Sequence, residues 1–205
     1  MAKGTETRTR ILNIAQEAVL AKGFGATSIE EIVAAAEITK GGFFYHFSDK
    51  NALALALIQR YIQVEDQILD DLERRARQLT DDPLQMYLVS LKLLEELLHD
   101  MPSGHPGCLI ATTVYQDQLF DRDVRDLNKM AMLSWRHRFR KLLDEIAKIY
   151  PPREDVSMTD VSDMLSSAVE GGIVLSKSTN DPGVVARQVG MYRSYIKLLF
   201  SPTRN

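Results

Sequence analysis

The chain has 205 residues, of which 45% are hydrophobic and 26% are charged, a balance typical of globular rather than disordered proteins. Its 25 basic and 28 acidic side chains give a formal net charge of −3, which excludes nucleic-acid binding by bulk positive charge but not a small local contact surface. One cysteine and four scattered histidines exclude an intramolecular disulfide and give no zinc-site spacing. No apolar run approaches the roughly 20 residues of a membrane span, and the polar start lacks a signal-peptide core. We therefore expect a cytoplasmic protein without a metal or cofactor.

Helical periodicity recurs in almost every long segment, which predicts an all-α fold of about nine helices. Two overlapping capping boxes, which begin at Thr27 and Ser28, leave the start of the second helix ambiguous. Ser48 is expected to cap the long fourth helix. The expected helices cover residues 6–22, 28–36, 39–46, 49–79, 83–100, 108–118, 121–150, 155–179 and 184–200. We expect an N-terminal three-helix domain over residues 1–48 and a C-terminal helical bundle over residues 49–205.

The two short helices 28–36 and 39–46, joined by a tight turn, have the layout of a helix-turn-helix. Such a unit places its second helix in the major groove of DNA. Phe43 and Phe47 are four residues apart and can anchor the inner face of that helix. Gly41 and Gly42 each cost a helix about 1 kcal/mol relative to Ala. Two consecutive glycines at the helix start therefore indicate that close approach to a partner matters more than helix stability.

Polar groups on and after the second short helix fit the same interpretation. Thr39, Lys40, Tyr45 and His46 can supply contacts to phosphates and base edges. Lys50 stands in the first turn of the next helix, where a cation opposes the helix dipole unless an anion is bound there. A DNA phosphate would be that anion.

The segments GFGATSIEEI (23–32) and ITKGGFFYHF (38–47), followed by Lys50, closely resemble the signature of the TetR family of bacterial transcriptional regulators, over roughly residues 6–58. The resemblance implies an all-α homodimer with an N-terminal DNA-binding domain and a C-terminal ligand and dimerisation domain. In the family, ligand binding usually releases the operator, and repression is the commoner mode. The DNA-facing positions that the resemblance implies are Thr27 or Ser28, Thr39, Lys40, Gly41, Gly42, Phe44, Tyr45, His46 and Lys50.

Two features qualify the DNA contact. The family usually has Tyr at position 44, and Phe44 cannot donate a hydrogen bond to a phosphate, which leaves that contact to Tyr45. Residues 1–50 carry six basic and six acidic side chains, so DNA affinity must come from where the charges stand. Lys3, Arg8 and Arg10 can add phosphate or minor-groove contacts.

Dimerisation is expected because two half-sites one helical turn apart require two recognition helices roughly 34–36 Å apart. The last two helices carry apolar stripes, which are either internal core or the interface; the resemblance favours the interface. The residues assigned to it are Val161, Leu165, Ala168, Gly172, Val185, Val189, Tyr192 and Ile196.

A small-molecule effector site is expected between the helices of the bundle, lined by adaptable and aromatic side chains. Taken singly, each of these side chains is of a type that is more often part of the core than of a ligand site. The candidates, which lie on the helices that enclose the pocket in the family, are Met86, Tyr87, Cys108, Thr112, Thr113, Tyr115, Gln116, Met132, Trp135, His137 and Met164.

Cys108 has two interpretations. It stands at an expected helix start, a setting that favours a reactive thiol, and the segment Gly107–Leu109 resembles a TetR subgroup with members that respond to electrophiles or oxidants. Alternatively it is a small buried hydrophobe. The basic run Arg136–Lys141 is expected to be a solvated face paired with Asp144 and Glu145, with a second DNA patch or an anion site as the alternative.

Two other classes of function fit the sequence less well. An enzyme is not expected, because the sequence has no Gly-rich phosphate loop, no G-x-S-x-G elbow and no H-E-x-x-H motif. A helical adaptor that binds only proteins would need neither the two glycines nor Lys50. The sequence therefore favours a ligand-responsive DNA-binding regulator, with thiol sensing through Cys108 as the alternative mode of response.

Overall fold

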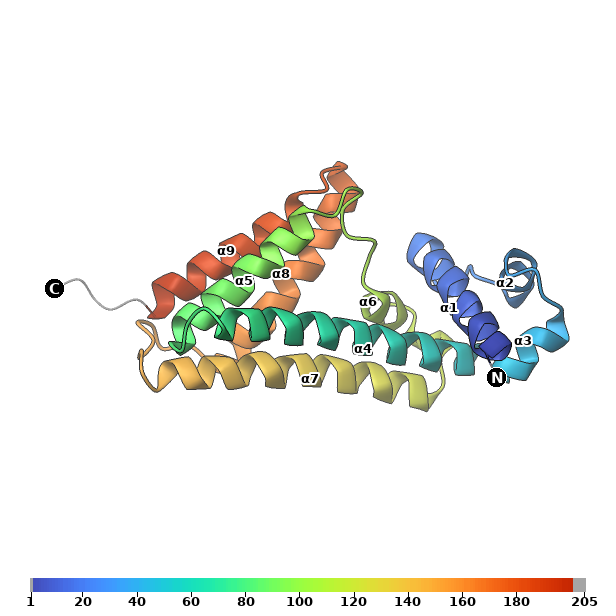
Figure 1. Ribbon diagram of the computed structural model, residues 1–205, viewed down its shortest axis with the longest axis horizontal. Coiled ribbons are helices and arrows are strands. Elements are labelled where there is room, and N and C mark those ends of the chain that lie inside the picture. Colours follow the sequence, from blue (N-terminus) through green and yellow to red (C-terminus); the bar gives the residue numbers. More distant parts are fainter. Residues whose placement is uncertain (1, 201–205) are drawn as a thin grey trace. The chain divides into compact units, whose positions relative to one another are not determined.

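The computed structural model describes residues 2–200, with side chains from residue 4 onward, and this part of the chain is helical throughout, without strands (Figure 1). The all-α fold and the nine expected α-helices are thus confirmed for these residues. In chain order they are α1 (Ala2–Lys22), α2 (Ile29–Ala35), α3 (Lys40–His46), α4 (Lys50–Arg77), α5 (Pro83–His99), α6 (Leu109–Val114), the 3-10 turn η1 (Asp117–Leu119), α7 (Arg122–Ala147), α8 (Met158–Thr179) and α9 (Val184–Phe200).

Side-chain caps define most helix starts. The structure corrects two expectations about the helices. Asp49, not Ser48, caps α4: its Oδ1 accepts the N–H of Ala52 at 2.8 Å. The sequence has two adjacent capping residues there, and the pattern could not choose between them. The single helix expected over 108–118 is broken into α6 and η1, with Tyr115 and Gln116 between them.

The chain packs as two compact units. The first contains the residues up to Glu65 together with Gly107–Ala131, and the second contains Asp66–Pro106 together with the residues from Met132 onward. Helices α4 and α7 each run from one unit into the other. The predicted boundary at residue 48 separates a DNA-binding domain from a bundle domain by function, and it stays a prediction.

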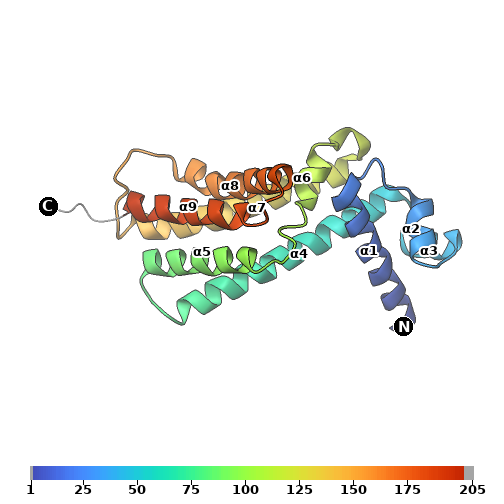
Figure 2. The ribbon, with the colours of Figure 1, turned by 90° about the horizontal axis from the view of Figure 1, so that it is seen from above.

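The first unit packs α1 against α2, α6 and, through Arg60, α4. Its core is made of side chains that are at most 3% exposed, which are Ile11, Ala15, Val19, Ile32, Phe43, Phe47, Leu53 and Leu57. Helix α6 lies beside α1, as both Figure 1 and Figure 2 show. Phe43 and Phe47, which the sequence predicts on the inner face of the helix 39–46, belong to this core.

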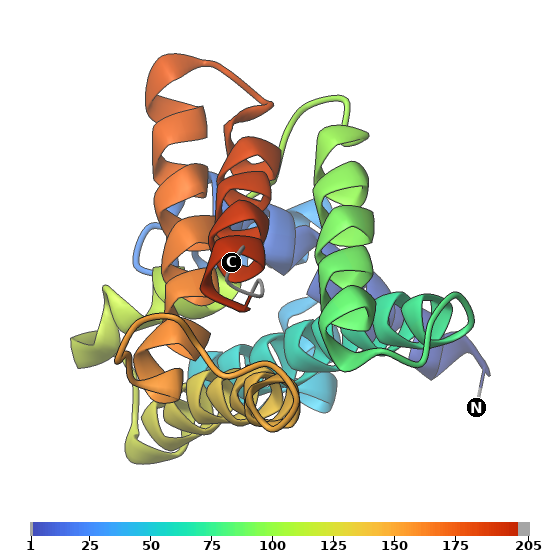
Figure 3. The ribbon, with the colours of Figure 1, turned by 90° about the vertical axis from the view of Figure 1, so that its left-hand side faces the viewer.

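In the second unit, α9 packs against α5 on one side and α8 on the other (Figure 3). The hydroxyls of Tyr87 and Tyr192 lie 3.1 Å apart at the centre, and Tyr192 also donates to the carbonyl of Val161. Burial raises the pKa of both phenols. The two phenol hydroxyls at the centre of this core therefore each have a partner.

This packing corrects the interface residues assigned from the sequence. Seven of the eight assigned residues are buried within the single chain, where they leave no surface for a partner: Val161, Leu165, Gly172, Val185, Val189, Tyr192 and Ile196. Only Ala168 is partly exposed. A Cβ at Gly172 would lie 3.1 Å from the Cα of Val185, so this glycine serves the contact between α8 and α9 of the same chain. An apolar stripe cannot distinguish a face buried by its own chain from one buried by a second copy.

None of the described helices has both the length and the apolar composition that a membrane-spanning helix requires.

Candidate nucleic-acid interface

Helices α2 and α3 form the expected helix-turn-helix. The side chain of Ser28 caps α2 by accepting the N–H of Glu31, and the side chain of Thr39 caps α3 by accepting the N–H of Gly42 at 3.0 Å. Between the helices, Glu37 adopts a left-handed conformation with φ of 52°. This single residue in the left-handed region reverses the chain between two helices of seven residues each.

The inner face of α3 holds the helix in the domain. Phe43 is fully buried and Phe47 is 3% exposed, and their ring centroids lie 5.7 Å apart. Ile32 of α2 is also fully buried. Burial of such large apolar side chains contributes about 2 kcal/mol each, which fixes the orientation of a helix too short to be stable alone.

The outer face of α3 presents the residues that the sequence assigned to DNA. Tyr45 is 84% exposed and Phe44 is 49% exposed, and neither ring is needed to fill the core. His46 is half-buried, with its ring 5.0 Å from that of Tyr45. Two neighbouring aromatic rings in solvent on a short helix form an unusual surface, because exposed apolar groups normally occur singly.

In the part of the chain that the structure describes, no close contact requires the two glycines of α3. A Cβ added at Gly41 would come no closer than 3.8 Å to another atom, and one at Gly42 no closer than 3.5 Å, which are ordinary contacts. Neither has a positive φ. Alanine would fit at both positions and would favour the helix by about 1 kcal/mol each. The contacts of the described residues therefore do not require glycine at either position.

Two lysines of the first unit form ion pairs with glutamates of α2. Lys40 Nζ lies 2.7 Å from Glu30 Oε1, and Lys22 Nζ lies 2.5 Å from Glu31 Oε2. The hydrogen bonds from these lysines lower the pKa of both carboxyl groups. All four side chains are well exposed, and such pairs are worth little in water, so a phosphate can compete for the ammonium groups.

Two assigned residues are engaged inside the domain instead. Lys50 is partly buried, and its Nζ donates to the carbonyl of Phe24 at 2.7 Å; partial burial lowers its pKa. Thr27 is 1% exposed and donates its hydroxyl to the carbonyl of Gly23. Both hold the loop ahead of α2 in this structure. Of the alternatives Thr27 and Ser28, only Ser28 is exposed.

The arginines of α1 lie at the surface of the protein. Arg8 and Arg10 are exposed, and the guanidinium of Arg8 lies 5.1 Å from the centre of the Phe47 ring. The side chain of Lys3 lies outside the described residues.

The effector candidates are spread over different environments. Met86, Tyr87 and Thr113 are buried, and Thr113 donates to main-chain carbonyls of α6 and contacts Asn128. Tyr115 is 75% exposed, and Met132, His137 and Met164 are also exposed. Cys108, Thr112, Gln116 and Trp135 are half-buried. Exposed side chains such as Tyr115 do not line an enclosed pocket, so the structure gives the assigned set no common site.

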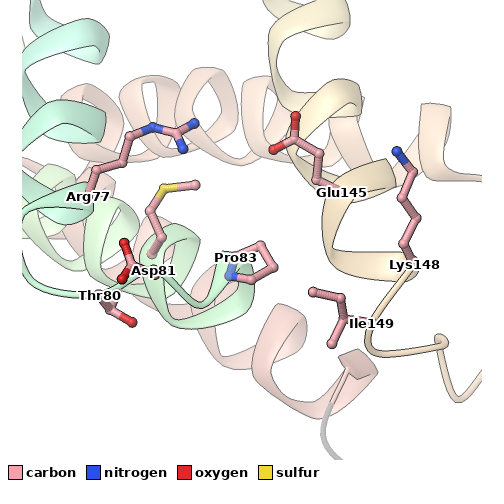
Figure 4. Close-up of a pocket in the computed structure, with 8 residues that line it drawn as sticks. Arg77, Thr80, Asp81, Pro83, Glu145, Lys148 and Ile149 are labelled. Carbon is pink, nitrogen blue, oxygen red and sulfur yellow. The ribbon is translucent and has the colours of Figure 1, made fainter.

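A cavity of about 380 Å³ lies in the second unit, between the α4–α5 connection and the end of α7 (Figure 4). Arg77 and Asp81 stand on one side, and Glu145 and Lys148 stand on the other. Thr80, Pro83, Met86 and Ile149 complete its lining. Of the effector candidates named from the sequence, only Met86 lines this cavity. The residues Thr80–Pro83 predict a turn, but a local sequence pattern does not reveal a cavity beside that turn.

The three arginines in the basic run of α7 are paired, and one of the two predicted partners, Asp144, is among their partners. Arg140 bonds Asp144 at 3.0 Å, and Arg136 makes two hydrogen bonds to Asp163 of α8. Arg138 pairs with Asp70 and Glu73 of α4. These arginines link α7 to its neighbours in the second unit.

Comparison with known proteins adds three findings. The model of a family described as bacterial regulatory proteins, tetR family, matches residues 11–57. The HTH-type transcriptional repressor DhaR from Mycobacterium sp. (strain GP1) is 23% identical over 84% of this chain and 83% of its own length. The HTH-type transcriptional repressor NemR from Escherichia coli (strain K12) is 32% identical over 74 residues, which are 35% of this chain and 37% of the relative.

Solved structures share the fold at low sequence identity. A transcriptional regulator of the TetR family from Agrobacterium tumefaciens superposes with a TM-score of 0.79 at 17% identity, over 97% of this chain and all of that one. The reduced form of E. coli NemR superposes with a TM-score of 0.76 at 16% identity, over 98% of this chain and all of that one.

Proposed function

Because the chain belongs to the tetR family of bacterial regulatory proteins, we propose that it is a cytoplasmic DNA-binding transcriptional regulator, with residues 1–48 as its DNA-binding domain. One observation carries the proposal: the exposed face of α3 combines Phe44 and Tyr45 with two glycines that no contact among residues 4–200 requires. A helix of this kind can enter the major groove, with its backbone close to DNA and its aromatic rings against sugars and thymine methyl groups.

A homodimer follows from the geometry of recognition, since one chain carries one recognition helix. The outer faces of α8 and α9 supply apolar surface that the chain does not cover. The exposed side chains on them are Met164, Val174, Leu175, Met191 and Leu198. We place the dimer contact on these residues, in place of the buried stripe that the sequence indicated.

The regulator acts as a repressor that releases its operator when a small molecule binds to the C-terminal bundle. The cavity beside Arg77 and Lys148 supports this step, because its volume lies in the range of small-molecule sites. A ligand shifts the equilibrium only through a difference in affinity between the two states, typically 1–3 kcal/mol.

The test begins with selection of duplexes from a random-sequence pool by the full-length protein, followed by mobility shift with a selected 30-base-pair duplex. Tyr45→Ala and Lys40→Ala should weaken binding at least tenfold and leave the melting temperature unchanged. Lys40→Ala should also reduce the salt dependence by about one phosphate contact per protomer. Lys129→Ala, at an exposed site on α7, is the matched control.

Glu30→Gln separates the two roles open to Lys40. If Lys40 binds phosphate, release from Glu30 strengthens DNA binding, whereas Lys40→Ala weakens it. If the pair only stabilises the domain, both variants change stability and neither changes affinity. Failure to recover any duplex from the pool would refute the proposed function itself.

A second candidate for the signal is the thiol of Cys108. The half-buried Cys108 caps α6, with Sγ accepting the N–H of Ala111 at 3.4 Å. An adduct on Sγ would remove this acceptor and loosen the start of α6. Iodoacetamide should then abolish binding to the selected duplex in the native protein but not in Cys108→Ser, whose hydroxyl keeps an acceptor; unchanged binding after full alkylation excludes this mode.

A further inference from the structure

The loop between α1 and α2 sets the direction in which α2 and α3 leave α1. Gly23 takes a left-handed φ of 84° at the end of α1, and α2 begins with the cap at Ser28. Because α2 and α3 have only seven residues each, they depend on tertiary contacts for their position.

The side chain of Gln116 lies across this loop. Its Oε1 accepts the N–H of Gly25 at 3.0 Å. A Cβ at Gly23 would lie 3.0 Å from Gln116 Nε2, and one at Gly25 would lie 3.1 Å from Cδ1 of Leu119. Side chains at either position would press against this segment, so the glycines leave room for it. We call the contact of Gln116 with Gly23 and Gly25 the Gln116 clamp.

Phe24, between the two glycines, is held from two further sides. Its ring lies 4.7 Å from that of Phe120, and both rings are buried. Its carbonyl accepts from Lys50, whose ammonium also lies 4.7 Å from the centre of the ring. The N–H of Asp121 donates to Asn51 of α4 at 3.3 Å. The segment 116–121 therefore contacts both the loop ahead of α2 and the start of α4.

We propose that Gln116 is a positioning residue for DNA recognition: the clamp holds the α1–α2 loop in the conformation in which the outer face of α3 can enter the major groove. This inference rests on the proposed function. Gln116 touches no DNA in this account and acts through the backbone of Gly25. The sequence assigned Gln116 to the effector pocket, whereas in the structure its side chain contacts the loop between α1 and α2.

The experiment compares two substitutions of nearly equal length. Gln116→Met removes the acceptor, so the loop loses its fixed position, and affinity for the selected 30-base-pair duplex should fall about tenfold, since each protomer of the dimer loses one net hydrogen bond. Gln116→Glu keeps an acceptor oxygen and should restore affinity to within threefold of the wild type. Gln118→Met, at an exposed site in η1, is the matched control and should bind like the wild type.

Two readouts separate positioning from general stability. Hydrogen exchange at the Gly25 amide should accelerate in Gln116→Met and stay slow in Gln116→Glu, while the melting temperatures of all three variants remain within about 2 °C of the wild type, as expected for loss of one exposed hydrogen bond. Equal or tighter DNA binding by Gln116→Met, or no recovery in Gln116→Glu, overturns the inference. In both of these cases duplex binding by the wild type leaves the proposed function intact.

Discussion

The sequence assigns both α3 and α9 a surface that meets a partner molecule, yet only α3 presents the assigned side chains to solvent. On α3, Tyr45 is 84% exposed, and a Cβ at Gly41 or Gly42 would make only ordinary contacts. On α9, Val189 and Ile196 are fully buried against neighbouring helices of the same chain. The two sequence signals differ in kind. The two consecutive glycines of α3 lower helix stability, so they indicate a role other than folding. The apolar stripe of α9 is an ordinary feature of a helix packed in a core, and burial within the same chain accounts for it.

The largest effect should come from the buried face of α9. Ile196→Ala removes a fully buried side chain and should lower the free energy of unfolding by about 2–5 kcal/mol, as measured by urea denaturation. Tyr45→Ala, on the exposed face of α3, should change it by about 0.5 kcal/mol or less. A loss below 1 kcal/mol in Ile196→Ala would mean that α9 is not packed as described.

The outer face of α9 should respond in the opposite way. Met191 is 66% exposed, so Met191→Glu should leave the fold of the chain intact. At a two-fold interface it would bring two carboxylates together, which should weaken the dimer by about 2 kcal/mol, or roughly 30-fold in Kd. Sedimentation equilibrium measures this directly. Gln85→Glu adds the same charge at an exposed site on α5 and should leave the association constant unchanged.

High pH tests the buried hydroxyl pair at the centre of the bundle. The pKa values of Tyr87 and Tyr192 are raised by burial, whereas in the unfolded chain both are about 10. Above pH 10 the unfolded state releases protons that the folded state keeps. The stabilisation is therefore complete below pH 10 and declines above it by about 1.4 kcal/mol per pH unit for each tyrosine.

A matched variant assigns this slope to the pair. Tyr87→Phe removes one of the two phenols, and it should roughly halve the decline of the free energy of unfolding between pH 10 and pH 11. An identical slope in the variant and the wild type would assign the decline to other groups.

These comparisons also indicate how far the sequence could be read. Helix periodicity and capping residues place all nine helices, because both signals are local. The inner face of α3 follows from the spacing of Phe43 and Phe47, and its outer face follows from the motif. The partners of Lys50 and Gln116 do not follow, because they are a main-chain carbonyl and an amide in a loop distant along the chain. The exposed faces of α8 and α9 do not follow from the sequence either, because they are known only when the fold shows which face of each helix is buried.

The smallest expected effect concerns the turn that joins α2 to α3. Glu37 has φ of 52°, a conformation that costs a residue with a Cβ about 1 kcal/mol and costs glycine nothing in steric terms. Glu37→Gly should therefore stabilise the chain by about 0.5–1 kcal/mol, the reverse of the loss of about 1 kcal/mol expected for Ala35→Gly within α2. Thermal unfolding of the two variants compares the signs directly. If Glu37→Gly also leaves affinity for the selected duplex unchanged, the strained backbone at this turn contributes nothing to DNA recognition. The difference between α3 and α9 then lies only in the exposed face of α3.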